Sequence, residues 1–175
     1  KFRFRLDKIG KIVPGGETGQ MSIYNGLKAA EEVYGVDDNI VLIHDGVRPL
    51  INEQIITDNI ECVKKNGAAI TSAPAKETFV LIDDEGRVAD IPSRDHSRIA
   101  KAPQSFYLKD ILEAQEWAIG NGNTSMIDSC TLMSAYGKKL ALIDGPTENI
   151  KITTPDDFYM FRAIYDAREN QQLEE

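Results

Sequence analysis

The sequence predicts an α/β domain in which helices cover a sheet and one β-hairpin arm protrudes. Helical and strand patterns alternate along most of the 175 residues, which favours a sheet flanked by helices. With 42% apolar residues the chain can bury one sizeable core, and its length favours a single domain over 1–175. The segment 78–97 breaks the alternation, because two strand patterns follow each other without a helix between them, and this indicates the arm.

The first half of the chain follows the alternation closely. A helical stripe of apolar residues covers 20–34, and a continuous apolar run over 39–44 predicts a buried strand. Asn52 is a good N-cap for the next helix, which should end at Gly67, and 68–74 returns as a strand. These four elements begin the sheet and its covering helices.

The second half begins with the arm. Apolar runs at 79–82 and 88–91 flank 83–86, whose acidic residues and glycine are a hairpin turn signal. The remaining elements are predicted as helices over 108–119 and 128–136, a strand at 140–143, a strand carrying Lys151, and a final helix with Phe158, Phe161 and Ile164.

The N-terminal residues fit this scheme least well. Residues 1–6 alternate charged and apolar side chains as an edge strand does, yet they lead into 11–16 without the helices that should flank a parallel sheet. We therefore expect the domain to be incomplete at its N-terminus.

Composition excludes several classes of function. A net charge of −8 argues against a general nucleic-acid binder, so any phosphate site must be a local cluster of cations. No apolar stretch approaches the length that spans a bilayer, and the N-terminus lacks the apolar core of a signal peptide, so a cytoplasmic location is expected. Cys62 and Cys130 lie far apart, and His44 and His96 form no metal pair; we expect packed, reduced thiols and no zinc site.

The run 149–157 carries the strongest functional signal. It places Lys151 on a predicted strand directly before a helix start, where Thr154 is a good N-cap, Pro155 suits the first helical position and Asp157 can accept from exposed backbone N–H groups. Junctions of this kind at a sheet edge hold anionic substrates in α/β enzymes. Lys151 is therefore expected to point at a ligand.

The run 44–49 supplies a carboxylate and a second cation. Asp45 closes an apolar strand, so its carboxylate should emerge at the carboxyl end of the sheet, where it suits a Mg²⁺ ion bound to triphosphate oxygens. The alternative is that Asp45 orders its own loop by pairing with Arg48. Arg48 offers a planar fork for a phosphate, and its alternative is a surface salt bridge.

Two further segments have polar side chains of interest. The glycine-rich turn 15–22 lets the backbone approach a base or phosphate, and Ser22 could hydrogen-bond to a nucleotide; a plain connection is the alternative.

After the arm, Arg94, Arg98 and Lys101 place three cations within eight residues of an acidic protein. A ligand site, a solvated face and a salt-bridge patch at a dimer interface all remain open for them. Thr78, at the base of the arm, is ambiguous because β-branched residues favour strands anyway.

Taken together, these runs resemble the cytidylyltransferase family that includes methylerythritol phosphate cytidylyltransferase and the ribitol phosphate cytidylyltransferases of cell-wall and capsule synthesis. The resemblance extends over about 12–164 and rests on the segments 15–22, 44–49, 73–78, 102–106 and 149–157. It implies a Rossmann-like nucleotidyltransferase sheet and an enzyme that joins CTP to a polyol phosphate with Mg²⁺, releasing pyrophosphate.

The resemblance also implies roles for individual residues. Lys151 and Asp45 would be catalytic, Asp45 would serve the metal, and both would contact the nucleotide together with Gly15, Gly16, Glu17, Ser22 and Gly46. Arg48, Thr78 and Arg94 match the acceptor-binding positions. The family pairs as homodimers through the arm, so Thr78 and Arg94 would serve the neighbouring subunit's site.

The chain departs from the family pattern at three places. The family's glycine-rich signature loop, with its arginine and lysine around the triphosphate, belongs upstream of Lys1 and is absent from these residues. Gly19 stands where the family often has arginine, and Ile127 stands where threonine is common.

The acceptor is inferred from one loop. The segment 90–96 resembles the ribitol phosphate branch more than the methylerythritol branch, so ribitol 5-phosphate is the favoured acceptor. Methylerythritol 4-phosphate, another polyol phosphate, an inactive nucleotide-binding remnant and a module of a larger enzyme are the alternatives.

Overall fold

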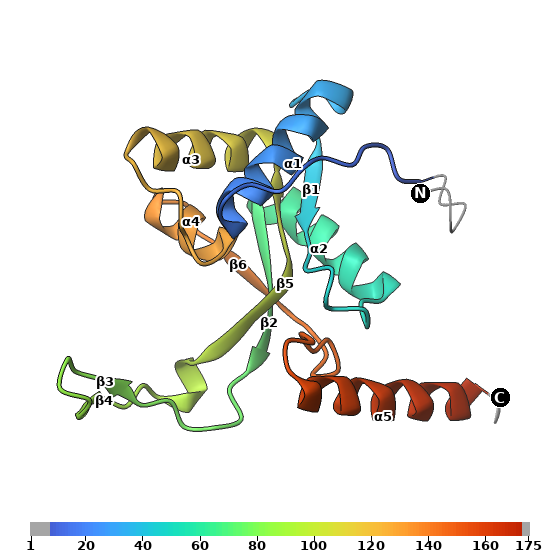
Figure 1. The fold of residues 1–175 in the computed structure, drawn as a ribbon, viewed down its shortest axis with the longest axis vertical. Coiled ribbons are helices and arrows are strands. Elements are labelled where there is room, and N and C mark those ends of the chain that lie inside the picture. The colour runs from blue at the N-terminus through green and yellow to red at the C-terminus, as the bar shows by residue number, and fades with distance from the viewer. Residues whose placement is uncertain (1–7, 173–175) are drawn as a thin grey trace.

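The computed structural model describes residues 8–172 and confirms the predicted α/β class, with a central sheet flanked by helices (Figure 1). In order, the elements are α1 (Gly19–Tyr34), β1 (Ile40–Ile43), α2 (Glu53–Asn66), β2 (Ala68–Pro74), β3 (Leu81–Ile82), β4 (Val88–Asp90), the short 3₁₀ helix η2 (Arg94–His96), β5 (Arg98–Tyr107), α3 (Leu108–Gly120), α4 (Ser129–Ala135), β6 (Ala141–Asp144) and α5 (Pro155–Gln172). The edge strand expected over 1–6 lies outside the described residues.

The central sheet has four strands in the order β1-β5-β2-β6. Strand β5 runs antiparallel to both of its neighbours, whereas β2 and β6 are parallel. Helices α1, α3 and α4 gather on one face, and α2 covers the other (Figure 1). Phe106 on β5 and Ile111 on α3 are fully buried in the core between the sheet and the first of these layers.

Strand β5 is the element that the sequence analysis did not predict. Its first three residues are exposed, its next residue is half-buried, and 102–106 are buried, so it shows neither alternation nor a continuous apolar run. Pro103 within the run further weakens the strand signal. Because β5 lies between β1 and β2 and runs antiparallel to both, the sheet is mixed rather than wholly parallel.

The prediction that Lys151 lies on a strand is wrong. Residues 149–153 are irregular, and one backbone–backbone hydrogen bond, from Ile152 N to Val47 O at 2.9 Å, joins them to the loop after β1. A single bond of this kind holds a segment in place without building a ladder.

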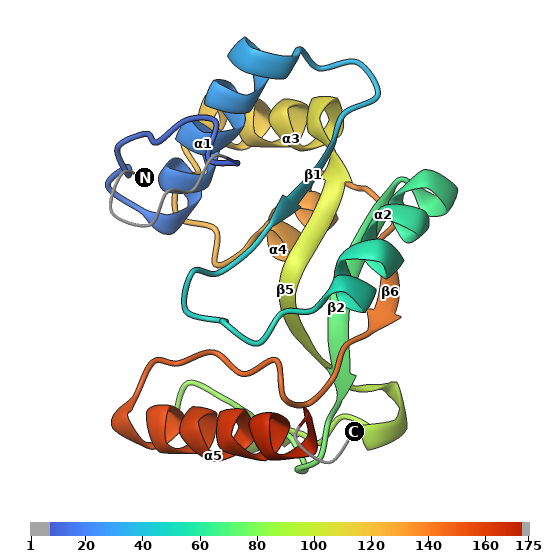
Figure 2. The ribbon, with the colours of Figure 1, turned by 90° about the vertical axis from the view of Figure 1, so that its right-hand side faces the viewer.

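The predicted hairpin arm is present, with shorter strands than expected. β3 and β4 pair antiparallel and are exposed on all sides, and the extended β2–β5 ladder carries them away from the core. Helix α5 lies at the same end of the molecule as the arm (Figure 2). Among the described residues, no helix is both long and apolar enough to cross a membrane.

Candidate active site

A pocket of about 290 Å³ opens where the loop after β1, the middle of β5, the start of α4 and the segment before α5 converge. Its lining combines charged and apolar side chains from these four segments with one residue each of α1 and β1: Ile23, Ile43, His44, Asp45, Arg48, Ala100, Lys101, Ala102, Gln104, Ile127, Asp128, Ser129 and Lys151. Residues 106 positions apart in the sequence thus face the same space.

Asp45 lies between two cations in this pocket. One carboxylate oxygen, Oδ2, accepts from Arg48 Nε at 2.9 Å, and the other, Oδ1, accepts from Lys151 Nζ at 3.2 Å. The two cations differ in exposure, since the Arg48 side chain is 11% exposed and that of Lys151 is 46% exposed. Arg48 is therefore built into the wall, whereas Lys151 remains open to a ligand.

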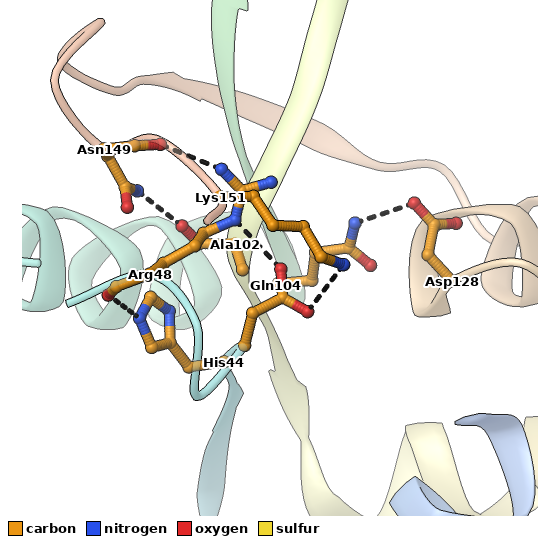
Figure 3. A network of polar contacts seen from close by, with 8 residues as sticks. His44, Arg48, Ala102, Gln104, Asp128, Asn149 and Lys151 are labelled. Carbon is orange, nitrogen blue, oxygen red and sulfur yellow. Dashed lines mark hydrogen bonds and ion pairs between the residues drawn. The ribbon is translucent and has the colours of Figure 1, made fainter. Parts of the chain in front are cut away.

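Arg48 also connects the loop after β1 to the rest of the site (Figure 3). Its Nη1 donates to Asn149 O at 2.8 Å, and the buried Asn149 donates from Nδ2 to Ala102 O at 2.7 Å. The backbone carbonyl of Arg48 lies 3.0 Å from His44 Nε2. This chain of bonds fixes the segment before Lys151 against β5, which explains how irregular backbone holds that lysine in place.

The Asp45 carboxylate is ionised at neutral pH. Burial alone would raise its pKa, but the hydrogen bonds from Arg48 and Lys151 outweigh burial and lower the pKa below the ordinary value. The site therefore offers a permanent negative charge flanked by two positive ones.

The opposite wall contains a second carboxylate that the sequence analysis treated only as a helix start. Asp128 caps α4 by accepting from Thr131 N at 2.8 Å, and its other oxygen accepts from Gln104 Nε2 at 3.0 Å. Burial would raise the pKa of Asp128, but these hydrogen bonds lower it. The cap signal was visible in the sequence; its position opposite Asp45 depends on β5, which was not predicted.

The glycine-rich turn does not line this pocket, and its residues Gly16 and Glu17 line a separate one. Gly16 N donates to Ser22 Oγ at 3.0 Å, and Ser22 Oγ donates to Thr18 O at 2.9 Å, so the serine stabilises its own turn. A Cβ on Gly16 would stand 2.5 Å from Met21 Cβ, which requires glycine there. Gly15 and Glu17 share this exposed turn, and Gly46 lies in the exposed loop next to Asp45.

The cation cluster after the arm is divided among three places. Arg94 donates to Thr78 Oγ1 at 3.0 Å on the arm, so these two predicted acceptor residues meet each other and do not line the pocket of their own chain. Arg98 donates to Ser72 Oγ and pairs with Asp144 at the sheet. Lys101 alone lines the pocket.

The predicted start of α5 is confirmed as a reciprocal cap. Asp157 Oδ2 accepts from Thr153 N at 2.9 Å and from Thr154 N at 2.8 Å, while Asp157 N donates to Thr154 Oγ1 at 3.3 Å. These hydrogen bonds lower the pKa of Asp157 to about 2. The cap fixes the backbone two residues after Lys151.

A Rossmann-like sheet with a pocket that holds an acidic residue and several cations is the framework of a nucleotidyltransferase. The chain belongs to the 2-C-methyl-D-erythritol 4-phosphate cytidylyltransferase (IspD) family, whose family model matches residues 3–167.

Named relatives fall into two groups. The chain is 59% identical over 171 residues to the ribitol-5-phosphate cytidylyltransferase of Streptococcus agalactiae serotype V, covering 98% of this chain and 71% of that protein. It is 54% identical over 172 residues to the enzyme of the same name from Vibrio parahaemolyticus, covering 98% and 72%. Identity to the 2-C-methyl-D-erythritol 4-phosphate cytidylyltransferase of Clostridium botulinum strain 657 is 37% over 162 residues, covering 93% and 69%.

Solved structures share the fold. The 4-diphosphocytidyl-2C-methyl-D-erythritol synthase of Anaerococcus prevotii superimposes with a TM-score of 0.79 at 32% identity, covering 89% of this chain and 70% of that one. The 2-C-methyl-D-erythritol 4-phosphate cytidylyltransferase of Thermus thermophilus gives a TM-score of 0.74 at 27% identity, covering 90% and 79%.

The cap at the start of α5 yields a pH prediction. Because the pKa of Asp157 is lowered from 3.8 to about 2, its stabilising bonds are fully present above about pH 4 and are lost as the pH falls toward 2. An NMR titration should therefore show the Asp157 carboxyl and the Thr153 and Thr154 amides changing together near pH 2. A midpoint near 3.8 would contradict this, and an Asp166→Asn variant, changed farther along α5, should leave all three signals unaffected.

Proposed function

We propose that the protein is a CTP-dependent cytidylyltransferase that transfers CMP to ribitol 5-phosphate and releases pyrophosphate. The observation that carries the proposal is the Asp45 carboxylate held between Arg48 and Lys151 in one pocket. Ribitol 5-phosphate is favoured over methylerythritol 4-phosphate because the relatives named for ribitol 5-phosphate are 54–59% identical, compared with 37% for the methylerythritol enzyme.

The reaction depends on the positioning of the two substrates and on stabilisation of negative charge on the phosphates, more than on acid–base catalysis. An oxygen of the acceptor phosphate attacks the α-phosphorus of CTP, forming a new P–O bond. The bond from that phosphorus to the oxygen bridging to the β-phosphate breaks, and pyrophosphate leaves with the electron pair. Lys151 is placed to donate to phosphate oxygens as negative charge moves toward the leaving group.

Asp45 fits the part of a Mg²⁺ ligand. It is ionised, its side chain is one third exposed, and Mg²⁺ at phosphate sites takes only one or two carboxylates beside waters and phosphate oxygens. Residues 8–172 contain no cluster of three His, Cys, Asp or Glu side chains that could hold a metal alone, so substrate phosphates would complete the coordination. The ion would supply neutralisation of the triphosphate charge.

The remaining assignments follow the family pattern. We propose that the backbone of Gly15, Gly16, Glu17 and Gly46, together with Ser22, contacts the nucleotide, and that Arg48 contacts the acceptor phosphate. The product would be CDP-ribitol, and the protein would serve wall or capsule polymer synthesis. The cytoplasmic location expected from the sequence stays a prediction.

We also propose a homodimer joined through the arm, in which Thr78 and Arg94 serve the neighbouring subunit's site. The support is the exposed apolar surface of the arm, where six side chains are 40–67% exposed: Phe79, Val80, Leu81, Ile82, Val88 and Ile91. Light scattering at micromolar concentration should give twice the monomer mass. A monomeric mass would contradict the shared site.

The activity is tested by pyrophosphate release from the complete protein with CTP and Mg²⁺, using ribitol 5-phosphate and methylerythritol 4-phosphate in parallel. Faster release with ribitol 5-phosphate is the expected result. Faster release with methylerythritol 4-phosphate would reassign the acceptor, and no release with either would favour another polyol phosphate or an inactive nucleotide-binding protein.

Lys151→Ala should lower turnover by about 10²–10³, because a fixed donor to developing charge typically contributes that much to the rate. Lys139→Ala, which removes an exposed lysine outside the pocket, is the matched control and should keep normal turnover. Both variants should retain the wild-type melting temperature. Near-normal turnover of Lys151→Ala would remove this residue from the reaction.

A further inference from the structure

Lys101 is a half-buried cation in the pocket that the mechanism above does not use. It lies in the middle of β5, and its ammonium donates to the backbone carbonyls of Pro146 at 3.3 Å and Thr147 at 3.2 Å. Two of the three ammonium protons are thus directed at the loop after β6. These two bonds fix the direction of the third proton.

No carboxylate compensates the charge of Lys101 within residues 8–172. Burial lowers the pKa of Lys101. The charges of two neighbouring cations, Arg48 and Lys76, lower this pKa further. Like charges that converge in a partly buried pocket are unfavourable on their own. They become favourable when an anion occupies the space between them.

The cations of the pocket differ in their partners. Lys151 and Arg48 both pair with Asp45, the residue suited to the metal and the triphosphate. Lys101 instead lies with Arg48 and near Lys76, which follows β2 at the base of the arm. An anion bound by Lys101 would therefore lie beside Arg48, the other lining cation that faces it.

We propose that Lys101 binds the phosphate of the acceptor together with Arg48. This inference rests on the proposed function for the identity of the acceptor, and on the pocket alone for the presence of a phosphate monoester site. In this arrangement, Lys101 anchors the nucleophilic phosphate while Lys151 and Asp45 hold the nucleotide. Lys101 thus sets the affinity for the acceptor and has little effect on the affinity for CTP.

Steady-state kinetics of Lys101→Gln in the complete protein test this division. The KM for ribitol 5-phosphate should rise about tenfold to a hundredfold, the range typical of a lost hydrogen bond to a charged group, while the KM for CTP stays within about twofold. Lys101→Arg, which keeps the charge, should recover most of the acceptor affinity. Lys65→Gln, on the exposed side of α2, is the matched control and should behave as wild type.

A purely structural role would give a different pattern. If Lys101 only tethered the carbonyls of Pro146 and Thr147, Lys101→Gln would lower the melting temperature and leave both KM values unchanged, and this result would overturn the proposal. An equal rise in both KM values would also overturn it.

A second measurement separates this inference from the proposed function. Inorganic phosphate is titrated into the protein by calorimetry, with no nucleotide present. Binding by wild type and Lys65→Gln that is lost in Lys101→Gln would support the anion site even if no polyol phosphate proved to be a substrate. Equal phosphate binding by wild type and Lys101→Gln would contradict it.

Discussion

The site depends on the Arg48 guanidinium, which is nearly buried and joins segments that lie far apart in the sequence. It donates to Asp45 on one side and to the Asn149 carbonyl on the other, and Asn149 in turn donates to β5 at Ala102. Loss of Arg48 from this partly buried pair would leave the Asp45 carboxylate with Lys151 as its remaining cationic partner. One side chain thus contributes to the ionised state of the carboxylate and holds the backbone that carries Lys151.

The exposure of the charged groups explains how the same pocket can have a fixed wall and still bind substrate phosphates. Arg48 donates to the protein from Nε and Nη1, whereas Lys151 makes one longer bond to Asp45 and stays half exposed. Lys101 donates only to neutral carbonyls. Substrate phosphates can therefore approach Lys151 and Lys101, in a wall that Arg48 fixes while it faces the same pocket.

Local signals in the sequence predicted most of the helices and strands. Asn52 caps α2 and Asp157 caps α5 as expected, because a cap depends on residues three positions apart. Strand β5 was not predictable in this way, since its burial comes from β1 and β2, which pair with it from distant parts of the chain. The same strand separates Lys101 from Arg94 and Arg98, so one cluster in the sequence became three sites in space.

The most direct test of phosphate binding by this network is a crystal structure of the complete protein with CDP-ribitol, the proposed product. The diphosphate is expected in the pocket, with one phosphate within hydrogen-bonding distance of Lys151 Nζ and the other within reach of Arg48 and Lys101. A product bound outside the Asp45 pocket, or a diphosphate that contacts neither Lys151 nor Arg48, would contradict the central claim that this network binds and positions the reacting phosphates.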